Sequence, residues 1–274
     1  MNETWRALNR EAALAAGHLA IGATALSRAN YAQHAYYGQA FFALTTGMER
    51  ATKLIVVADH AIEHDGVFPS HQLLRGYSHR LRELLEVADD IAERRSLSGL
   101  GARLPRASIH DGIIGVLSDF ANNLTRYYNL ALATADPKAE QVVDPVRAWF
   151  EQVTQPVLAA HYTQRHREKH EANARIIAKM LGGNVSVLYH AETGQQLDKV
   201  EDASALTGMT EFAIPFTRMY VLQIARFLAR VLAELGHAGY ALREPLIPHF
   251  SEIFAIFLND DKFLRSRKTW SIYP

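Results

Sequence analysis

The feature that most constrains the fold is a series of long stretches in which apolar residues recur at helical spacing. Over residues 31–62 these positions follow one another at steps of three and four: Phe41, Leu44, Met48, Ala51 and Ile55. Residues at such steps share one face of an α-helix. The same kind of pattern predicts helices over residues 4–28, 71–95, 110–134, 145–181, about 215–236 and about 246–258. We therefore expect a mainly α protein, in which the helix over 31–62 packs antiparallel to the helix over 71–95.

Glycine, proline and short polar residues mark the expected ends of these helices. Their content predicts loops over residues 64–70 and 96–109. Residues 135–138 read Ala-Asp-Pro-Lys and are the best candidate for a linker. This linker divides the chain into two expected regions, a helical domain over 1–135 and a second helical region over 139–274.

Prolines are expected to shape the helices of the second region. Asp144 and Pro145 suit a helix start, with the aspartate as cap and the proline as first residue. Pro156 lies inside the pattern over 145–181 and is expected to kink or break it, because proline lacks the N–H that an inner helical turn needs. Pro215 is expected to open the helix that follows it.

One segment carries a clear β pattern. Residues 185–190 are rich in β-forming residues, residues 191–194 read Ala-Glu-Thr-Gly, and residues 195–200 can return as a second strand. The pattern predicts a β-hairpin over about 185–200. An isolated hairpin is marginally stable in water, so we expect it to rest on a helix or on a partner chain.

The charge balance limits how the chain can bind nucleic acid. It has 29 Lys and Arg residues against 29 Asp and Glu residues, so its formal net charge is zero. Proteins that bind nucleic acid by charge alone are usually basic overall. Any nucleic-acid site in this chain must therefore be a local basic patch.

Several classes of site and location are not expected. The chain has no cysteine, which excludes disulfides, thiolate zinc sites and cysteine nucleophiles. It has no run of about 18 apolar residues and no pattern typical of a signal peptide, so we expect a cytoplasmic protein without a membrane partner. The Gly-x(4)-Gly-Lys-Ser/Thr, Gly-x-Gly-x-x-Gly and Gly-x-Ser-x-Gly motifs are absent. No cofactor is expected.

The order of features between residues 34 and 85 resembles a known family. The residues that carry the resemblance are His34, Ala35, Ala40, Phe41, Ala43 and Leu44, then Met48, Glu49 and Lys53, then a loop with Gly66, Phe68 and Pro69, and finally Ser78, His79, Leu81, Leu84 and Leu85. This order resembles the HEPN superfamily of helical nucleotide- and RNA-associated domains. The family pattern is a long helix with an alanine-rich face and a Glu-x-x-x-Lys step, a loop, and a helix start like Gly-His-x-Leu. The chain departs from it at Gly47, where a larger residue is more common, and at Ser78, where glycine is usual.

The resemblance implies a fold and two classes of function. Members are four- or five-helix up-and-down bundles that commonly dimerise. They act as nucleotide-binding partners of nucleotidyltransferases, or as metal-independent ribonucleases in defence and toxin–antitoxin systems. For this chain it implies a homodimeric binding module for a nucleotide or RNA in a stress or defence system, with a partner protein from the same operon. The alternatives are a metal-independent endoribonuclease and a purely structural dimerisation protein.

Two Arg–His pairs are candidates for catalysis if the chain is a ribonuclease. Ribonuclease members of the family carry Arg-x(4–6)-His, in which histidine can move a proton and arginine can neutralise phosphoryl charge. Arg165 and His170 have this spacing and lie about 140° apart around a helix, so they can reach one groove from its two sides. Arg103 and His110 have it where a loop meets a helix.

Each pair also has a plainer interpretation. Arg165 and His170 belong to a charge-dense segment that is typical of a solvated helical face. Arg103 and His110 are equally consistent with a chance pairing in an arginine-rich loop. The segment that contains Arg165 also places His161, His166 and His170 near one another on a helix. It lacks a clear carboxylate ligand, so no metal site is expected.

Four further residues are candidates for ligand binding. Arg75 and His79 lie inside the stretch that resembles the family, one residue too close for the ribonuclease spacing. His79 is expected to hydrogen-bond across the bundle and fix the loop before it. Arg126, with Tyr127 or Tyr128, can stack on a base or hold a phosphate. The alternative is that these aromatic residues belong to the core.

Overall fold

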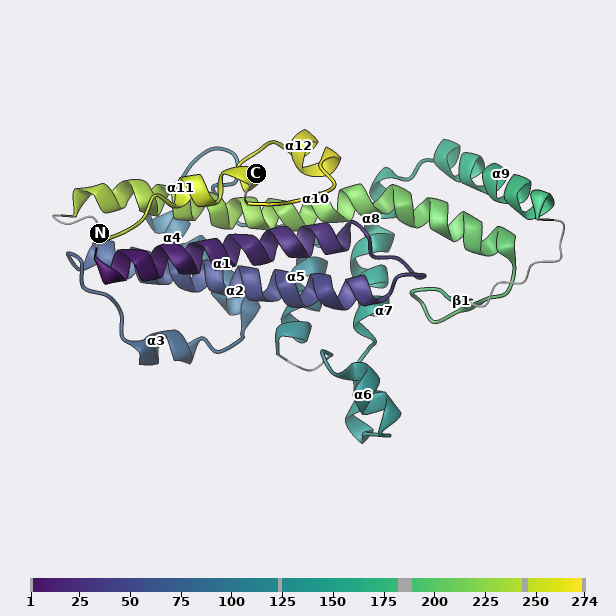
Figure 1. Ribbon diagram of the computed structural model, residues 1–274, viewed down its shortest axis with the longest axis horizontal. Helices are drawn as coiled ribbons and strands as arrows, with labels where there is room; N and C mark the ends of the chain where they lie inside the picture. Colours follow the sequence, from purple (N-terminus) through teal and green to yellow (C-terminus); the bar gives the residue numbers. More distant parts are fainter. Residues whose placement is uncertain (1, 123–124, 182–188, 243–245, 273–274) are drawn as a thin grey trace.

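Three long helices form the centre of the molecule. The computed structural model describes residues 2–122, 125–181, 189–242 and 246–272. In it α1 (Glu3–Leu26) and α2 (Ala35–Glu63) run antiparallel, and α10 (Val200–Ala238) lies along both of them (Figure 1). The part of the chain that is described is mainly helical, with one short pair of strands. The mainly α class predicted from the sequence is therefore confirmed.

Two glycines let α1 and α2 approach closely. A Cβ atom on Gly22 of α1 would lie 2.6 Å from Cγ of Leu44, and one on Gly47 of α2 would lie 2.9 Å from the backbone nitrogen of Leu19. A side chain at either position would therefore push the two helices apart. The close approach of the two helices is the physical reason for a glycine at position 47.

The direction predicted for the helix after the first loop was wrong. The stretch 71–95 forms two helices, α3 (His71–Gly76) and α4 (Leu81–Arg94). At the start of α4, Nδ1 of His79 lies 3.0 Å from Oε2 of Glu49, and at its end Nη2 of Arg94 lies 2.6 Å from Oδ2 of Asp59. Residue numbers rise together in these pairs, so α4 runs parallel to α2. Residues 64–80 make this possible because they cross back along α2 before α4 begins.

The segment predicted as one helix over 110–134 is also divided. It forms α5 (Ser108–Ala121) and α6 (Tyr128–Ala133), and residues 123–124 lie outside the described part. Helix α6 has no buried residue among those described and projects from the bundle (Figure 1). A 3₁₀ turn follows at Pro137–Gln141, where the linker was expected.

The helices after Asp144 follow the proline predictions in part. Pro145 is the first residue of α7 (Pro145–Trp149), and the side chain of Asp144 accepts from the N–H of Val146, as expected. The helical path then passes through a π turn (Phe150–Thr154) into α8 (Gln155–His161). Pro156 lies in the first turn of α8, directly after this π turn, so the helical path is distorted beside the proline but is not broken there. The break falls before α9 (Gln164–Met180).

Pro215 lies inside α10 and does not open it. The helix begins at Val200 and continues through the proline to Ala238. The missing N–H of Pro215 removes the partner of the carbonyl group of Glu211, an exposed residue that water can reach. Helix α9 packs along the first half of α10 and supports it.

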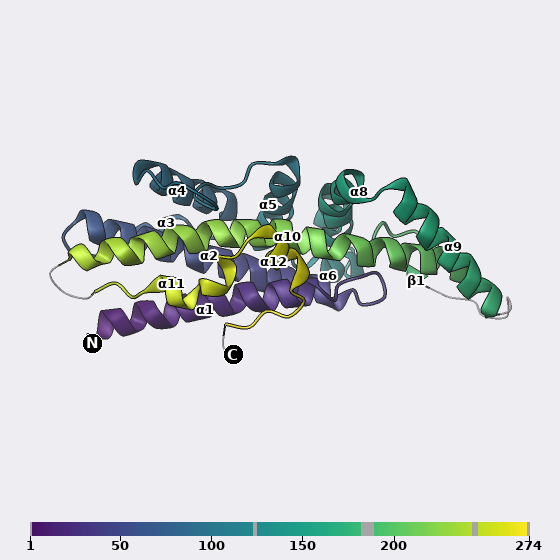
Figure 2. The same cartoon turned by 90° about the horizontal axis from the view of Figure 1, so that it is seen from above.

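The first half of α10 extends beyond the bundle as an arm. We use this name for α9 and residues 200–215 of α10 together with the hairpin, whose strands are β1 (Tyr189–His190) and β2 (Gln196–Leu197) (Figures 1 and 2). Tyr189 pairs with Leu197 in antiparallel register. The predicted hairpin is confirmed over these strands, while residues 185–188 lie outside the described part.

The hairpin rests on helices, as expected. Ala191 and Leu197 pack with Ala203 of α10 in a small cluster to which Tyr31 contributes. The hydroxyl of Tyr31 donates a hydrogen bond of 3.0 Å to the carbonyl of Ala203. The connection between α1 and α2 therefore contacts the arm near the first residue of α10.

The C-terminal segment covers the bundle with short elements. A 3₁₀ turn (Gly239–Ala241) ends α10, and α11 (Phe250–Ile253), a 3₁₀ turn (Ala255–Phe257) and α12 (Asp261–Ser266) follow. The single helix predicted over 246–258 is thus replaced by shorter turns. None of the described helices is both long and apolar enough to cross a membrane.

One hydrophobic core joins the two expected regions. Its largest fully buried side chains come from both sides of the predicted linker: Phe41 from the first region and Trp149, Phe227, Phe250, Phe254 and Phe257 from the second. The division into 1–135 and 139–274 stays a prediction, and the packing gives the two regions a shared interior.

Two glycines of α2 give a matched test of the helix contact. Gly47→Ala should lower the free energy of unfolding by about 1–3 kcal/mol, because the new methyl group meets the α1 backbone. Gly38→Ala should raise it by about 0.5–1 kcal/mol, because Gly38 has nothing within 4 Å of an added Cβ. Urea unfolding followed by circular dichroism measures both. Equal effects of the two substitutions would contradict the close approach at Gly47.

Candidate functional site

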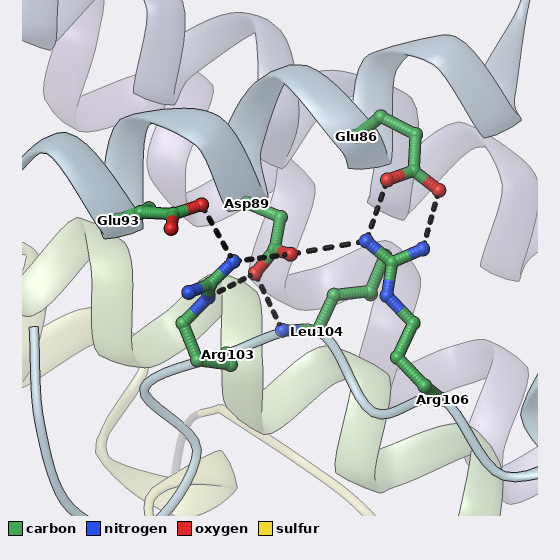
Figure 3. A network of polar contacts seen from close by, with 6 residues as sticks. All are labelled: Glu86, Asp89, Glu93, Arg103, Leu104 and Arg106. Carbon is green, nitrogen blue, oxygen red and sulfur yellow. Dashed lines mark hydrogen bonds and ion pairs between the residues drawn. The ribbon is translucent and has the colours of Figure 1, made fainter.

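Arg103 is part of an ion-pair network that fastens the loop before α5 to α4. Its Nε and Nη2 atoms lie 2.9 and 3.0 Å from the two carboxylate oxygens of Asp89, and Nη2 lies 3.1 Å from Glu93 (Figure 3). Arg106 binds Glu86 through two hydrogen bonds of 2.6 Å and reaches Asp89 at 3.0 Å. The guanidinium group of Arg103 is therefore engaged in holding the loop.

Asp89 is the centre of this network. It is buried, and its Oδ1 atom also accepts a hydrogen bond of 2.8 Å from the backbone N–H of Leu104. Burial alone would raise the pKa of Asp89, but the hydrogen bonds from Arg103, Leu104 and Arg106 hold it below its ordinary value. The carboxylate therefore stays charged at neutral pH.

His110, the predicted partner of Arg103, is held by a different helix. Its Nε2 atom lies 2.7 Å from Oε1 of Gln223, and its ring meets the ring of Tyr220 edge to face at 5.2 Å. Burial lowers the pKa of His110, so its ring is neutral at pH 7. Arg103 contacts α4 and His110 contacts α10, so these contacts do not bring the pair together.

His170 lines a cavity, but Arg165 does not. The cavity has a volume of about 480 Å³ and lies between α9, α10 and the hairpin. Nδ1 of His170 lies 2.9 Å from the hydroxyl of Tyr162, and its ring packs against Gly208, where a Cβ atom would lie 2.9 Å away. Burial and then the charge of Lys169 lower the pKa of His170. Arg165 is exposed, and the arginine that lines this cavity is Arg167.

His79 fixes the start of α4, as the sequence suggested. Glu49 accepts from Nδ1 of His79 at 3.0 Å and from Lys53 at 2.7 Å, and Lys53 also donates to the carbonyl of Ser78 at 2.9 Å. The Glu-x-x-x-Lys step of α2 thus joins α2 to the turn before α4. Burial alone would raise the pKa of Glu49, but these hydrogen bonds lower it.

Arg75 lies apart from His79 in a shallow basic hollow. This hollow of about 390 Å³ is also lined by Arg50, Lys53 and His71. Arg50 already forms two hydrogen bonds to Glu11, at 2.7 and 2.8 Å. Much of the positive charge in the hollow is therefore balanced by carboxylates of the same helices.

Arg126 is stacked on two aromatic rings of the protein. Its guanidinium group lies 5.4 Å from the ring centre of Phe42 and 5.5 Å from that of Phe120. It lines a small hollow of about 230 Å³ next to Tyr128. Tyr127 is 59% exposed and does not line this hollow.

The three histidines around α9 have separate partners. His161 contacts the hydroxyl of Tyr220 at 3.0 Å, and His166 caps its own helix by contacting Thr163. Within the described ranges, no group of three His, Cys, Asp or Glu residues is placed to hold a metal ion.

The Arg-x(4–6)-His spacing also occurs elsewhere in the chain. Arg28 and His34 have it, as do Arg230 and His237 on α10. Arg230 forms an ion pair of 2.9 Å with Glu234. A spacing that recurs this often selects no site without a cavity around it.

Arg218 of α10 is the most unusual charged residue that the sequence analysis missed. It is 1% exposed, and its guanidinium group donates to Oγ of Ser27 at 2.7 Å and to the backbone carbonyl of Arg265. Its Nε atom is buried without a partner. Among the described residues no carboxylate pairs with Arg218. Burial lowers its pKa to about 10, so the buried group is still charged at neutral pH.

Arg218 lines a pocket with an excess of positive charge, which we call the Arg218 pocket. It has a volume of about 680 Å³ and lies where the end of α1, the middle of α10 and the end of α12 meet. Arg265 and Lys268 add two cations, against the single carboxylate of Glu211 among the described lining residues. The other lining residues are Ser27, Phe212, Ile214, Pro215, Phe216 and Ser266.

The aromatic side of the Arg218 pocket is already used to stack a cation. The guanidinium group of Arg265 lies 5.3 Å from the ring centre of Phe216, and Phe212 lies 5.4 Å from Phe216. A charged edge beside aromatic faces suits a ligand that has an anionic group and a flat apolar part.

A sequence signal for Arg218 does exist. It lies within the run Ile214-Pro215-Phe216-Thr217-Arg218-Met219-Tyr220-Val221-Leu222, with no acidic residue three or four positions away. An arginine in such a run must be buried without a partner on its own helix. No family model matches the chain, and no curated protein or solved structure matches it either. The chemistry of these side chains therefore carries the functional argument.

The Asp89 network gives a prediction about stability and pH. Asp89→Asn should lower the free energy of unfolding at pH 7 by about 2 kcal/mol, because it removes the charged partner of Arg103 and Arg106. The loss should not be larger, because both arginines are half-exposed and solvent screens their charges. Since the folded pKa of Asp89 is depressed, its contribution is complete above the unfolded value of about 4 and is lost as pH falls below it. The difference between wild type and Asp89→Asn in urea unfolding should therefore shrink between about pH 5 and pH 2.

The neighbouring Asp90 provides the control for this experiment. It is exposed, so Asp90→Asn should change stability by no more than about 0.5 kcal/mol. A difference between wild type and Asp89→Asn that stays constant down to pH 2 would exclude the titration of Asp89 as its cause.

Proposed function

We propose that this protein is a binding module for an anionic, phosphate-bearing ligand of the nucleotide or RNA class. The observation that carries the proposal is the buried, charged Arg218 without a carboxylate partner. A buried charge that is not paired is costly, and a bound anion offsets that cost. Phosphate suits the site because arginine can offer it two parallel hydrogen bonds.

The rest of the Arg218 pocket supports the same class of ligand. Arg265 and Lys268 are exposed at its rim, where they can attract an anion from solution. Phe212 and Phe216 form an aromatic wall against which the flat apolar part of a nucleotide can pack. The volume of about 680 Å³ is in the range typical of small-molecule sites.

A metal-independent endoribonuclease is the second candidate, and the observed contacts favour it less. Catalysis needs the proton-transferring group and the cation beside one phosphate. Arg103 and His110 have partners on different helices, and Arg165 does not line the cavity that His170 lines. A homodimer, a role in stress or defence and an operon partner stay predictions based on the family resemblance. A cytoplasmic location stays a prediction based on the sequence pattern.

Anion binding can be measured directly. Inorganic phosphate and a nucleoside monophosphate should each raise the Tm of the protein, by an amount that grows with ligand concentration. The monophosphate should bind more tightly than phosphate if its base packs against Phe212 or Phe216. The double substitution Arg265→Ala with Lys268→Ala should lower the affinity for both ligands by about tenfold or more, as measured by isothermal titration calorimetry.

Lys262 supplies the matched control for the charge change. It is an exposed lysine of α12 that does not line the Arg218 pocket, so Lys262→Ala should leave both affinities unchanged. If phosphate and the monophosphate leave the Tm unchanged, Arg218 serves only to join the ends of α1 and α12, and the proposal is wrong.

The ribonuclease alternative has its own test. Total RNA is incubated with wild type in the presence of a chelator, beside the variants His170→Ala, His110→Ala and His237→Ala. A binding module should leave the RNA intact. Cleavage by wild type that one of these substitutions lowers by about 100-fold would instead establish the endoribonuclease and name its histidine.

A further inference from the structure

The cavity beside the hairpin holds a buried carboxylate that the proposed function does not use. Glu192 lies in the turn between β1 and β2 and is only 3% exposed. The turn is tight: the N–H of Gly194 donates to the carbonyl of Ala191 at 2.8 Å, and Gly194 has a φ of +83°. This geometry places the side chain of Glu192 in the wall of the cavity.

Among the described residues, a partner exists for only one oxygen of this carboxylate. The hydroxyl of Tyr37 donates to Oε1 at 3.2 Å, whereas Oε2 is buried and accepts no hydrogen bond from any described residue. Burial, and then the charge of Glu192, raises the pKa of Tyr37 well above its ordinary value. Tyr37 is therefore always a donor, and a single neutral donor leaves the carboxylate charge largely unbalanced.

The surroundings of Glu192 are acidic. Glu171 and Asp202 also line the cavity. The basic side chains among the described lining residues are Arg167 and His170. His170 is neutral at pH 7 because burial and its basic neighbours lower its pKa. Three carboxylates thus face a single guanidinium group, which makes the cavity attractive to a positive ligand.

The remaining wall is apolar and aromatic. It includes the rings of Phe150 and Tyr162 and the aliphatic side chains of Leu206 and Met209. Aromatic faces attract ammonium groups, and aliphatic side chains suit a hydrocarbon stem. Since the described residues form no cluster fit for a metal ion, an organic cation matches the cavity better.

We propose that this cavity binds an aliphatic amine, whose ammonium group pairs with Glu192 and whose stem lies along Leu206 and Met209. The ammonium group supplies the donors that Oε2 lacks, and the charges of Asp202 and Glu171 hold the ligand near the mouth. This site is independent of the Arg218 pocket, because it takes a ligand of opposite charge and is lined by other residues.

The experiment uses the full chain and 1,4-diaminobutane, with 1,4-butanediol as the neutral probe of the same length. In isothermal titration calorimetry the diamine should bind and the diol should not. Glu192→Gln should lower the affinity for the diamine by about tenfold or more, because it removes the buried charge. It should still fold, since the amide oxygen can accept the hydrogen bond from Tyr37, and circular dichroism checks this.

Two further variants separate binding from structure. Glu201→Gln changes an exposed carboxylate that does not line the cavity, so it should bind the diamine as wild type does. Tyr37→Phe keeps the carboxylate, and it should also still bind the diamine. Absence of diamine binding by wild type, or equal binding by Glu192→Gln, would overturn the proposal.

Discussion

The continuity of α10 through Pro215 is the constraint on which both candidate sites depend. Four residues between 202 and 209, before the proline, line the cavity that contains Glu192, which we call the Glu192 cavity. Six residues between 211 and 218, around the proline, line the Arg218 pocket. A helix that began at Pro215 would leave the earlier residues without a fixed position. The same continuous helix also carries α9 and the hairpin, whose contacts complete the Glu192 cavity.

Three buried charges in this protein show how burial separates structure from function. Asp89 accepts hydrogen bonds from two arginines and one backbone N–H, so its charge is balanced within the protein. Arg218 has only neutral partners, and Glu192 has one hydroxyl. Balanced charges hold elements together, whereas unbalanced ones beside a cavity favour a ligand of opposite charge.

Local patterns predicted the helices better than their arrangement. The apolar spacing located α1 and α2, and the β-rich segment located the hairpin, because both depend on neighbours in sequence. The direction of α4 depends on how residues 64–80 cross the bundle, and no local pattern records that path. The start of α10 was wrongly predicted at Pro215 for a related reason. Helix α9, which packs along α10 and supports it, comes from another part of the chain.

The candidate site was harder to predict, because spacing along the chain does not report contacts across it. Arg103 matched a catalytic spacing, yet Asp89 and Glu93 of α4 occupy its guanidinium group. Arg218 matched no motif, and its significance lies in its burial without a carboxylate partner among the described residues. Arg165 and His170 were close in sequence, but only His170 faces a cavity.

The position of Pro215 also gives the arm a mechanical property. From Pro215 to Val200 the helix rises about 22 Å at 1.5 Å per residue, and a proline inside a helix is a common point of bending. A bend of about 10° there would move the far end of α10 by about 4 Å. The hydrogen bond from Tyr31 to Ala203 opposes such a movement, because it ties that end to the connection between α1 and α2. Pro215 also lines the Arg218 pocket, so a ligand bound there would contact the point at which α10 can bend.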